Sequence, residues 1–191
     1  MIEPSGTTNA SSWQHGLDAL HAGGVIAYPT EAVFGLGCDP RNESALQKII
    51  DIKGRDSHKG FILIAASQTQ LAPYLASIQD PWQRQFDEHW PGPVTFVVPA
   101  SDDVRNTLLT GFRDTLAVRV SAHPVVRQLC EQYDGAIVST SANRSGEPSL
   151  RTAAAVRQSM GAQINEIVDE PVGTRDAPSS IFDVVSGEQL R

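Results

Sequence analysis

The sequence has few cysteines, few lysines and no long apolar run. Two cysteines in 191 residues, Cys38 and Cys130, make neither a disulfide framework nor a zinc-binding set, so nothing indicates an oxidising compartment. The longest apolar run, residues 61–66, is far shorter than the roughly 20 residues that span a bilayer. Residues 1–14 lack the basic start and apolar core of a secretory signal. We therefore expect a soluble cytoplasmic protein without a membrane partner.

Several familiar catalytic motifs are also absent. The sequence has no G-x-x-x-x-G-K-[ST] phosphate loop, no C-x-x-C pair, no H-E-x-x-H and no G-x-S-x-G. Gly35-Leu36-Gly37 lacks the third glycine of a dinucleotide-binding fingerprint. The five histidines have no metal-ligand spacing, so we predict surface or capping roles for them and no metal ligand among the protein side chains.

The charge is acidic overall but unevenly distributed. A net charge of −7 and a pI near 5.1 weigh against general binding to nucleic acids or membrane surfaces. All three lysines, Lys48, Lys53 and Lys59, lie within twelve residues of one another, and Arg55 lies among them. This cluster is typical of an anion-binding segment, and equally of a solvated helix end followed by a basic loop.

Apolar segments of strand and helix type alternate along the chain. Hydrophobic residues make up 40% of the sequence, enough for a sizeable core. Strands are predicted at residues 25–28, 61–66, 95–98, 116–120, 136–138 and 181–185, with a last short strand after 186–187. Helices are predicted around residues 13–20, 46–50, 71–75, 82–86, 126–130 and 153–160. The alternation predicts one α/β domain over residues 1–191, built on a twisted sheet. Some connections are short and lack a helix, for instance between Val98 and Leu116, so we expect the sheet to be mixed. The loop-rich last forty residues are expected to pack over an edge or a cleft.

Three segments carry groups suited to ligand binding. Residues 28–37 place a polar turn and two glycines after a buried strand, which is typical of ligand-binding backbone and equally of an ordinary strand-to-helix loop. Residues 53–59 combine lysine and arginine, which suit a polyphosphate. Residues 139–146 hold four hydroxyls; a capping turn is the alternative, but it needs fewer.

Five motifs occur in an order that resembles the YrdC family of threonylcarbamoyl-AMP synthases, in its bacterial short form. They are Tyr28 to Gly37, Lys53-Gly54-Arg55, Trp90-Pro91-Gly92-Pro93-Val94-Thr95, Leu116 to Val120 with His123-Pro124, and Ser139 to Gly146. The resemblance extends over residues 14–191, nearly the whole chain.

The resemblance implies an enzyme. Members of the family condense L-threonine, bicarbonate or CO2, and ATP into L-threonylcarbamoyladenylate and pyrophosphate. Other proteins of the pathway then transfer the threonylcarbamoyl group to N6 of adenosine 37 in tRNA. Magnesium is expected with the ATP substrate, and direct contact with tRNA is a further expectation. The resemblance also implies a YrdC-like fold, an open, concave, twisted sheet with a positively charged cavity.

The resemblance assigns roles to individual residues of this chain. Lys53 and Arg55 are expected to stabilise the departing pyrophosphate electrostatically, with no covalent nucleophile. The expected ATP ligands are Arg55, Lys59, Thr115, Ser141, Asn143, Ser149 and Arg191. The expected threonine ligands are Ala32, Arg119, Ser139 and Ser179.

One buried arginine and three departures from the family pattern affect the predicted site. Arg119 alternates with apolar neighbours on its strand, so it must meet an anion: the threonine carboxylate, or an Asp or Glu in a structural ion pair. Many family members carry threonine where this chain has Ala32, asparagine in place of Lys59 and histidine in place of Ile64. Residues 171–191 are expected to cover the site. The chain ends at Arg191 without the second domain of the longer forms, so we expect it to depend more on partners.

Two other functions are compatible with parts of the sequence. An RNA-binding module, for tRNA or double-stranded RNA, would use the same basic cavity to hold a phosphate backbone. A thiol enzyme would use Cys38, but no base lies near it in the sequence, which favours a buried, inert cysteine.

Overall fold

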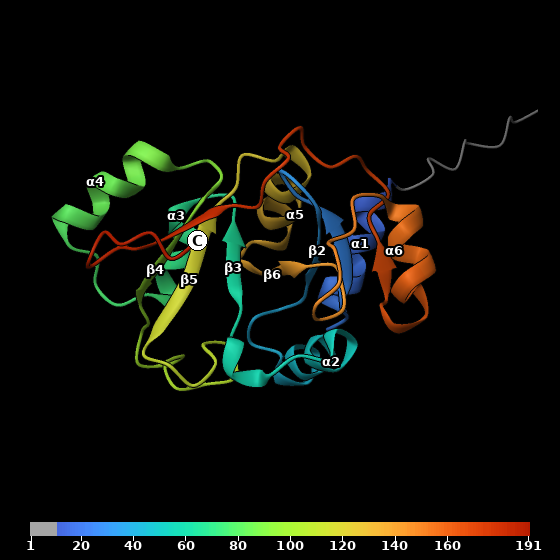
Figure 1. Cartoon of the computed structure of the whole chain (residues 1–191), viewed down its shortest axis with the longest axis horizontal. Coiled ribbons are helices and arrows are strands. Elements are labelled where there is room, and N and C mark those ends of the chain that lie inside the picture. Colours follow the sequence, from blue (N-terminus) through green and yellow to red (C-terminus); the bar gives the residue numbers. More distant parts are fainter. Residues whose placement is uncertain (1–10) are drawn as a thin grey trace, which may run out of the picture.

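Eight strands form one open, mixed sheet in the computed structural model, which describes residues 11–191 (Figure 1). The strand order is β7-β1-β2-β6-β3-β5-β4-β8; β1–β7, β3–β5 and β4–β8 are parallel pairs and the others antiparallel. The predicted open, mixed sheet is thus confirmed. Residues 1–10, on which the signal-peptide expectation mainly rests, lie outside the described residues. The strands are β1 (Ile26–Pro29), β2 (Phe34–Gly37), β3 (Ile62–Ala65), β4 (Val94–Pro99), β5 (Thr115–Val120), β6 (Ile137–Ser141), β7 (Glu166–Ile167) and β8 (Ser180–Asp183).

The helices begin and end at local signals in the sequence. In α2, the Asn42 side chain accepts a hydrogen bond from the Ala45 amide (3.1 Å), and Gly54 ends the helix at φ +58°. No helix within residues 11–191 has both the length and the apolar character needed to cross a membrane. The helices are α1 (Ser12–His21), α2 (Glu43–Lys53), α3 (Gln68–Leu71), α4 (Asp80–His89), α5 (Pro124–Tyr133) and α6 (Ala153–Met160), with 3-10 turns at Ser57–Lys59, Ala72–Tyr74 and Gly161–Gln163.

Helices α1 and α5 cover only part of one face of the sheet. Alternate strand residues face opposite sides, so Ile64 of β3 and Ile137 of β6 pack against α5 in one apolar cluster. Two residues away on the same strands, Ile62 and Ser139 lie on the same face but line an open cavity instead. This uncovered part of the face positions the site.

Residues 34–37 show where local sequence misled the strand assignment. They form β2, which pairs antiparallel with β1 in a hairpin, rather than part of a strand-to-helix loop. Gly37 is needed there because a Cβ would lie 2.6 Å from both the Tyr28 ring and the Val138 carbonyl. Two of its four residues are glycines, which have low strand propensity, so the local sequence does not predict a strand here. The two-residue β7 was not predicted, and the strand expected after residue 187 is a single bridge between Phe182 and Gln189.

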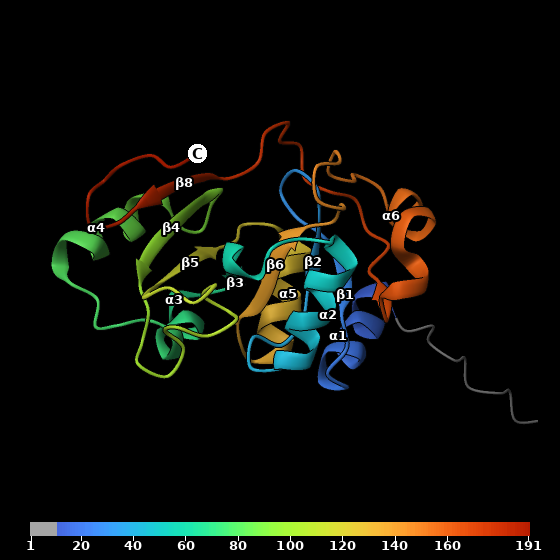
Figure 2. The ribbon, with the colours of Figure 1, turned by 60° about the horizontal axis from the view of Figure 1, so that its bottom comes forward.

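The C-terminal segment crosses the whole sheet. Strands β7 and β8 lie at opposite edges, so residues 168–179 must span the width between them, as Figures 1 and 2 show. Four residues of this crossing, Arg175 and 177–179, line the cavity. The expectation that the last forty residues pack over a cleft is therefore confirmed.

Candidate functional site

A basic cavity of about 560 Å³ lies on the uncovered part of the sheet. Among the described residues that line it, Glu31 is the only carboxylate, against seven cationic side chains. Such an excess of positive charge in a partly enclosed space favours a polyanionic ligand. The seven cations are Lys53, Arg55, Lys59, Arg113, Arg119, Arg175 and Arg191.

The fold brings together nearly all the residues singled out from the sequence, from six separate segments. Thr115 is the exception: it begins β5 opposite Pro99 of β4 and is not among the lining residues, so its contact with ATP stays a prediction. The predicted residues that line the cavity are Ala32, Lys53, Arg55, Lys59, Arg119, Ser139, Ser141, Asn143, Ser149, Ser179 and Arg191.

Arg55 lies over an aromatic ring at the wall of the cavity. Its guanidinium carbon is 4.3 Å from the centroid of the Phe61 ring, a cation–π contact. One Nη donates to the Thr140 hydroxyl (3.2 Å) and the other to the Gly60 carbonyl, while the buried Nε has no partner among the described residues. Burial lowers the pKa of Arg55 to about 10, so it remains charged at neutral pH. Arg55 therefore contributes a positive charge to the cavity wall.

Lys53 is buried at the end of α2 and faces the loop that follows β6. Burial, together with the nearby charges of Arg55 and Lys59, lowers the pKa of its ammonium to about 8. An anion entering the cavity would favour the charged amine and raise this pKa again.

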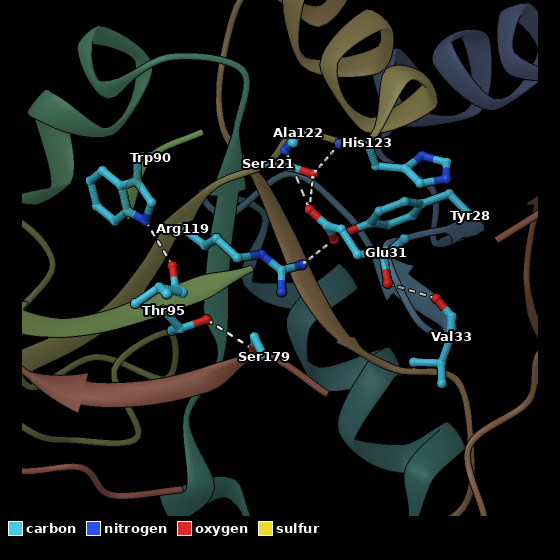
Figure 3. A network of polar contacts seen from close by, with 12 residues as sticks. Tyr28, Glu31, Val33, Trp90, Thr95, Arg119, Ser121, Ala122, His123 and Ser179 are labelled. Carbon is cyan, nitrogen blue, oxygen red and sulfur yellow. Dashed lines mark hydrogen bonds and ion pairs between the residues drawn. The ribbon is translucent and has the colours of Figure 1, made fainter. Parts of the chain in front are cut away.

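Arg119 and Glu31 form a buried ion pair at the inner end of the cavity (Figure 3). Arg119 Nη2 lies 3.2 Å from Glu31 Oε2, and the two side chains are only 8% and 13% exposed. Glu31 Oε1 accepts hydrogen bonds from the Ser121 hydroxyl (2.7 Å) and the Ala122 amide (3.3 Å). Burial favours the neutral acid, but Arg119 and the Ser121 hydroxyl outweigh it and lower the pKa of Glu31. Of the two anions expected for Arg119, this structure shows the protein carboxylate.

Ser179 joins the crossing segment to the sheet and to the C-terminal residue. The Thr95 hydroxyl donates to Ser179 Oγ (3.1 Å), and Arg191 Nη2 donates to the Ser179 carbonyl (3.2 Å). Burial and the charge of Arg119 lower the pKa of Arg191. Ser179 and Arg191, twelve residues apart in sequence, thus form one part of the cavity wall.

The positions that depart from the family pattern lie in different parts of the structure. Lys59 lies at the exposed rim and Ala32 in the lining, whereas Ile64 is fully buried under α5 and belongs to the core. Cys38 is also fully buried, and burial raises the pKa of its thiol well above the usual range. A thiol nucleophile at Cys38 is therefore disfavoured.

Sequence reasoning missed four residues of the site. Glu31 sits inside the first motif but carried no assignment, Phe61 appeared to be an ordinary core residue, and Arg113 and Arg175 lie outside every motif. Arg113 donates to the carbonyl of His58 (2.6 Å) at the rim. Glu31 had one usable signal, because a buried arginine on a strand demands a carboxylate. Within residues 11–191, no group of three or more His, Cys, Asp and Glu side chains is arranged to hold a metal ion.

The cavity and fold have counterparts among known proteins. Residues 18–191 match the Sua5/YciO/YrdC family model, described as telomere recombination. A threonylcarbamoyl-AMP synthase of Idiomarina loihiensis is 48% identical over 184 residues, covering 95% of this chain and 98% of that protein. One of Halorhodospira halophila is 48% identical over 178 residues, covering 93% of each.

Solved structures agree with the sequence relatives. Sua5 of P. abyssi, complexed with L-threonine, matches with a TM-score of 0.87 at 32% identity. The match covers 96% of this chain and 55% of that one, so the chain spans about half the length of this relative. YciO of E. coli matches with a TM-score of 0.78 at 24% identity over 90% of this chain and 82% of that one, and shares the fold.

Proposed function

The chain belongs to the Sua5/YciO/YrdC family, and we propose that it is a threonylcarbamoyl-AMP synthase. It condenses L-threonine, bicarbonate or CO2, and ATP into L-threonylcarbamoyladenylate and pyrophosphate. The observation that carries the proposal is the cavity itself, in which seven cations and a single, already paired carboxylate surround a space of about 560 Å³. This charge pattern suits a triphosphate together with an amino-acid carboxylate.

The adenylating step needs positioning and charge rather than a nucleophilic side chain. An oxygen of threonine carbamate attacks the α-phosphorus of ATP, a new P–O bond forms, and the bond to the β-phosphate oxygen breaks. Negative charge then grows on the departing pyrophosphate. The positive charges of Arg55, Lys53 and Lys59 stabilise that charge.

Threonine is expected at the end of the cavity where Arg119 lies. The free Nε of Arg119 is buried there, and Ser139 and Ala32 line the same space. A substrate carboxylate shares Arg119 with Glu31 or takes over part of its contact. We propose that Ala32, Arg119, Ser139 and Ser179 surround threonine. The remaining predicted residues are assigned to the nucleotide side: Ser141, Ser149, Thr115 and Arg191 as contacts, and Asn143 through the loop that it holds.

Magnesium is proposed to enter as part of the ATP substrate. The lining offers no unpaired carboxylate for the metal among the described residues, since Glu31 is bound to Arg119. The triphosphate oxygens are hard ligands that Mg²⁺ prefers. We further propose that other proteins of the same pathway accept the product and transfer it to tRNA in the cytoplasm, with the basic rim near Arg113 available to RNA.

The alternative, an RNA-binding module without enzymatic activity, is not favoured. Two relatives that are 48% identical and align over more than nine-tenths of the chain are named as threonylcarbamoyl-AMP synthases. The net charge of −7 also opposes a general grip on a phosphate backbone.

Pyrophosphate release provides the direct test. The protein is incubated with ATP, Mg²⁺ and bicarbonate, with L-threonine, with L-serine or without an amino acid. We expect release that requires both threonine and bicarbonate. Folded protein that releases no threonine-dependent pyrophosphate contradicts the synthase, and salt-sensitive RNA binding by that protein would then support the alternative.

A further inference from the structure

Lys53 has no hydrogen-bond donor left for a ligand. Its Nζ donates to the carbonyl of Ser141, to the carbonyl of Asn143 (2.9 Å) and to Asn143 Oδ1 (3.2 Å). A lysine ammonium has three donors and no acceptor, so all three protons are directed at oxygen atoms of the protein. The residue is also 95% buried, at 5% exposure. The ammonium therefore holds the end of β6 and the start of the segment that continues from it. Residues 141–147 are called here the 141–147 loop.

The Asn143 side chain is equally committed. Its Oδ1 accepts from Lys53 and from the Ser141 hydroxyl (2.6 Å), and its Nδ2 donates to the carbonyls of Arg144 (2.8 Å) and Glu147 (2.7 Å). A primary amide has two donors and two acceptor sites, and all four are used. Asn143 thus braces the 141–147 loop from within and offers no free group to a ligand.

Main-chain contacts join the same two segments. The Ser145 amide donates to the Lys53 carbonyl (2.8 Å), and Arg144 Nη1 donates to the Ile52 carbonyl (3.2 Å). The last carbonyls of α2, which have no partner within the helix, are satisfied by the loop. The attachment is therefore reciprocal: α2 donates through a side chain and accepts through its backbone.

We propose that Lys53 is a positioning residue, which clips the 141–147 loop to α2 in the shape that turns Ser145, Gly146 and Ser149 toward the cavity. These three residues line the cavity, and Gly146 has φ +86°, a conformation that suits glycine. Lys53 then acts on the nucleotide through the loop, in addition to the charge it contributes to the cavity. The kinetic consequence rests on the proposed function, whereas the structural consequence does not.

A double-mutant cycle distinguishes positioning from direct contact. Binding of a non-hydrolysable ATP analogue is measured for Lys53→Met, Asn143→Ala and the double variant. We expect each single change to weaken binding about tenfold or more. The affinity of the double variant should lie within about threefold of that of the weaker-binding single variant, because both changes break the same hydrogen-bond network. L-Threonine affinity should change much less than nucleotide affinity. Multiplied losses in the double variant would overturn the proposal, because they indicate independent contacts.

Hydrogen exchange tests the clip without any activity. In the ligand-free protein, Lys53→Met should speed exchange of the Ser145 and Glu147 amides, which are bonded within the clip. Lys48→Met is the matched control: it lies on the same helix, and its Nζ bonds Asn165 (2.9 Å) away from the loop. If Lys53→Met does not fold, Asn143→Ala tests the same network from the acceptor side.

The outcomes separate the two proposals. Unchanged exchange at Ser145 and Glu147 in both variants refutes the clip. If the variants exchange faster there but the wild-type protein releases no threonine-dependent pyrophosphate, the clip is supported and the proposed function is contradicted.

Discussion

Replacing Glu31 with glutamine should destabilise the protein far more than its size suggests. Glu31→Gln leaves the Arg119 guanidinium buried without a counter-charge. Removing one partner of a buried ion pair typically costs about 3–5 kcal/mol. Because Glu31 retains 13% exposure, we expect a loss near the lower end, ~3 kcal/mol.

Thermal unfolding measures this loss directly. For a protein of this size, 1 kcal/mol shifts Tm by about 2–4 °C, so a drop of about 6–12 °C is expected. Glu131→Gln is the matched control, because it breaks an exposed i,i+4 pair with Arg127 that is 43% and 51% exposed. Such a pair is worth about 0.3–0.5 kcal/mol. A Tm loss in Glu31→Gln no larger than in the control would refute the argument.

The pH dependence provides a second check of the same ion pair. The pKa of Glu31 is lower in the folded protein than its ordinary value of 4.5. Its contribution to stability is therefore fully present above pH 4.5 and is lost as pH falls through the lowered pKa. The difference in stability between wild type and Glu31→Gln should shrink below pH 4.5. A difference that stays constant down to acid unfolding would contradict the ion-pair explanation.

Threonine should partly replace the missing carboxylate. Ligands that bind only the folded state raise Tm, and the unpaired Arg119 gives the substrate carboxylate a site without a competitor. We expect L-threonine to raise the Tm of Glu31→Gln more than that of wild type, whereas L-threoninamide, which lacks the carboxylate, should not. Equal shifts with both compounds would remove Arg119 from the threonine site.

Four further predictions concern the nucleotide side and the buried thiol. Arg55→Ala should weaken binding of a non-hydrolysable ATP analogue by ~1.5–3 kcal/mol, measured by calorimetry, and unchanged affinity and turnover would remove Arg55 from the site. Phe61→Leu should weaken it by ~0.5–2 kcal/mol, because the site keeps an apolar, somewhat smaller side chain but loses the ring beneath Arg55. Equal affinity would show that the ring does not position Arg55. ATP affinity should fall as pH rises through about 8, where the Lys53 ammonium loses its proton. Calorimetry in buffers of different ionisation enthalpy should detect proton uptake on ATP binding, and Lys53→Met should abolish that uptake. Cys38→Ala should retain activity, since its thiol is fully buried; loss of turnover in a folded variant would reinstate a thiol mechanism.

Much of the architecture was accessible from the sequence because its causes are local. Asn42 and Gly54 mark the start and the end of α2 through their own cap geometry. The apolar run of β3 is typical of a strand buried on both faces. The alternation of helices and strands predicted the α/β class, and the connection without a helix between Val98 and Leu116 predicted a mixed sheet. The motifs also identified most of the cavity lining, since residues that bind one ligand are confined to a few short segments.

The partners of those residues were decided by the tertiary structure. Lys53 and Asn143 are ninety residues apart, and Glu31 and Ser121 are also ninety residues apart, so no local pattern relates them. β2 exists because β1 and β6 flank it, although its two glycines make it a weak strand by itself. The sequence therefore determined which groups are available and where helices begin and end. Only the folded chain decided which charge meets which, because a buried ion pair or a fully bonded lysine depends on segments that the sheet order brings together.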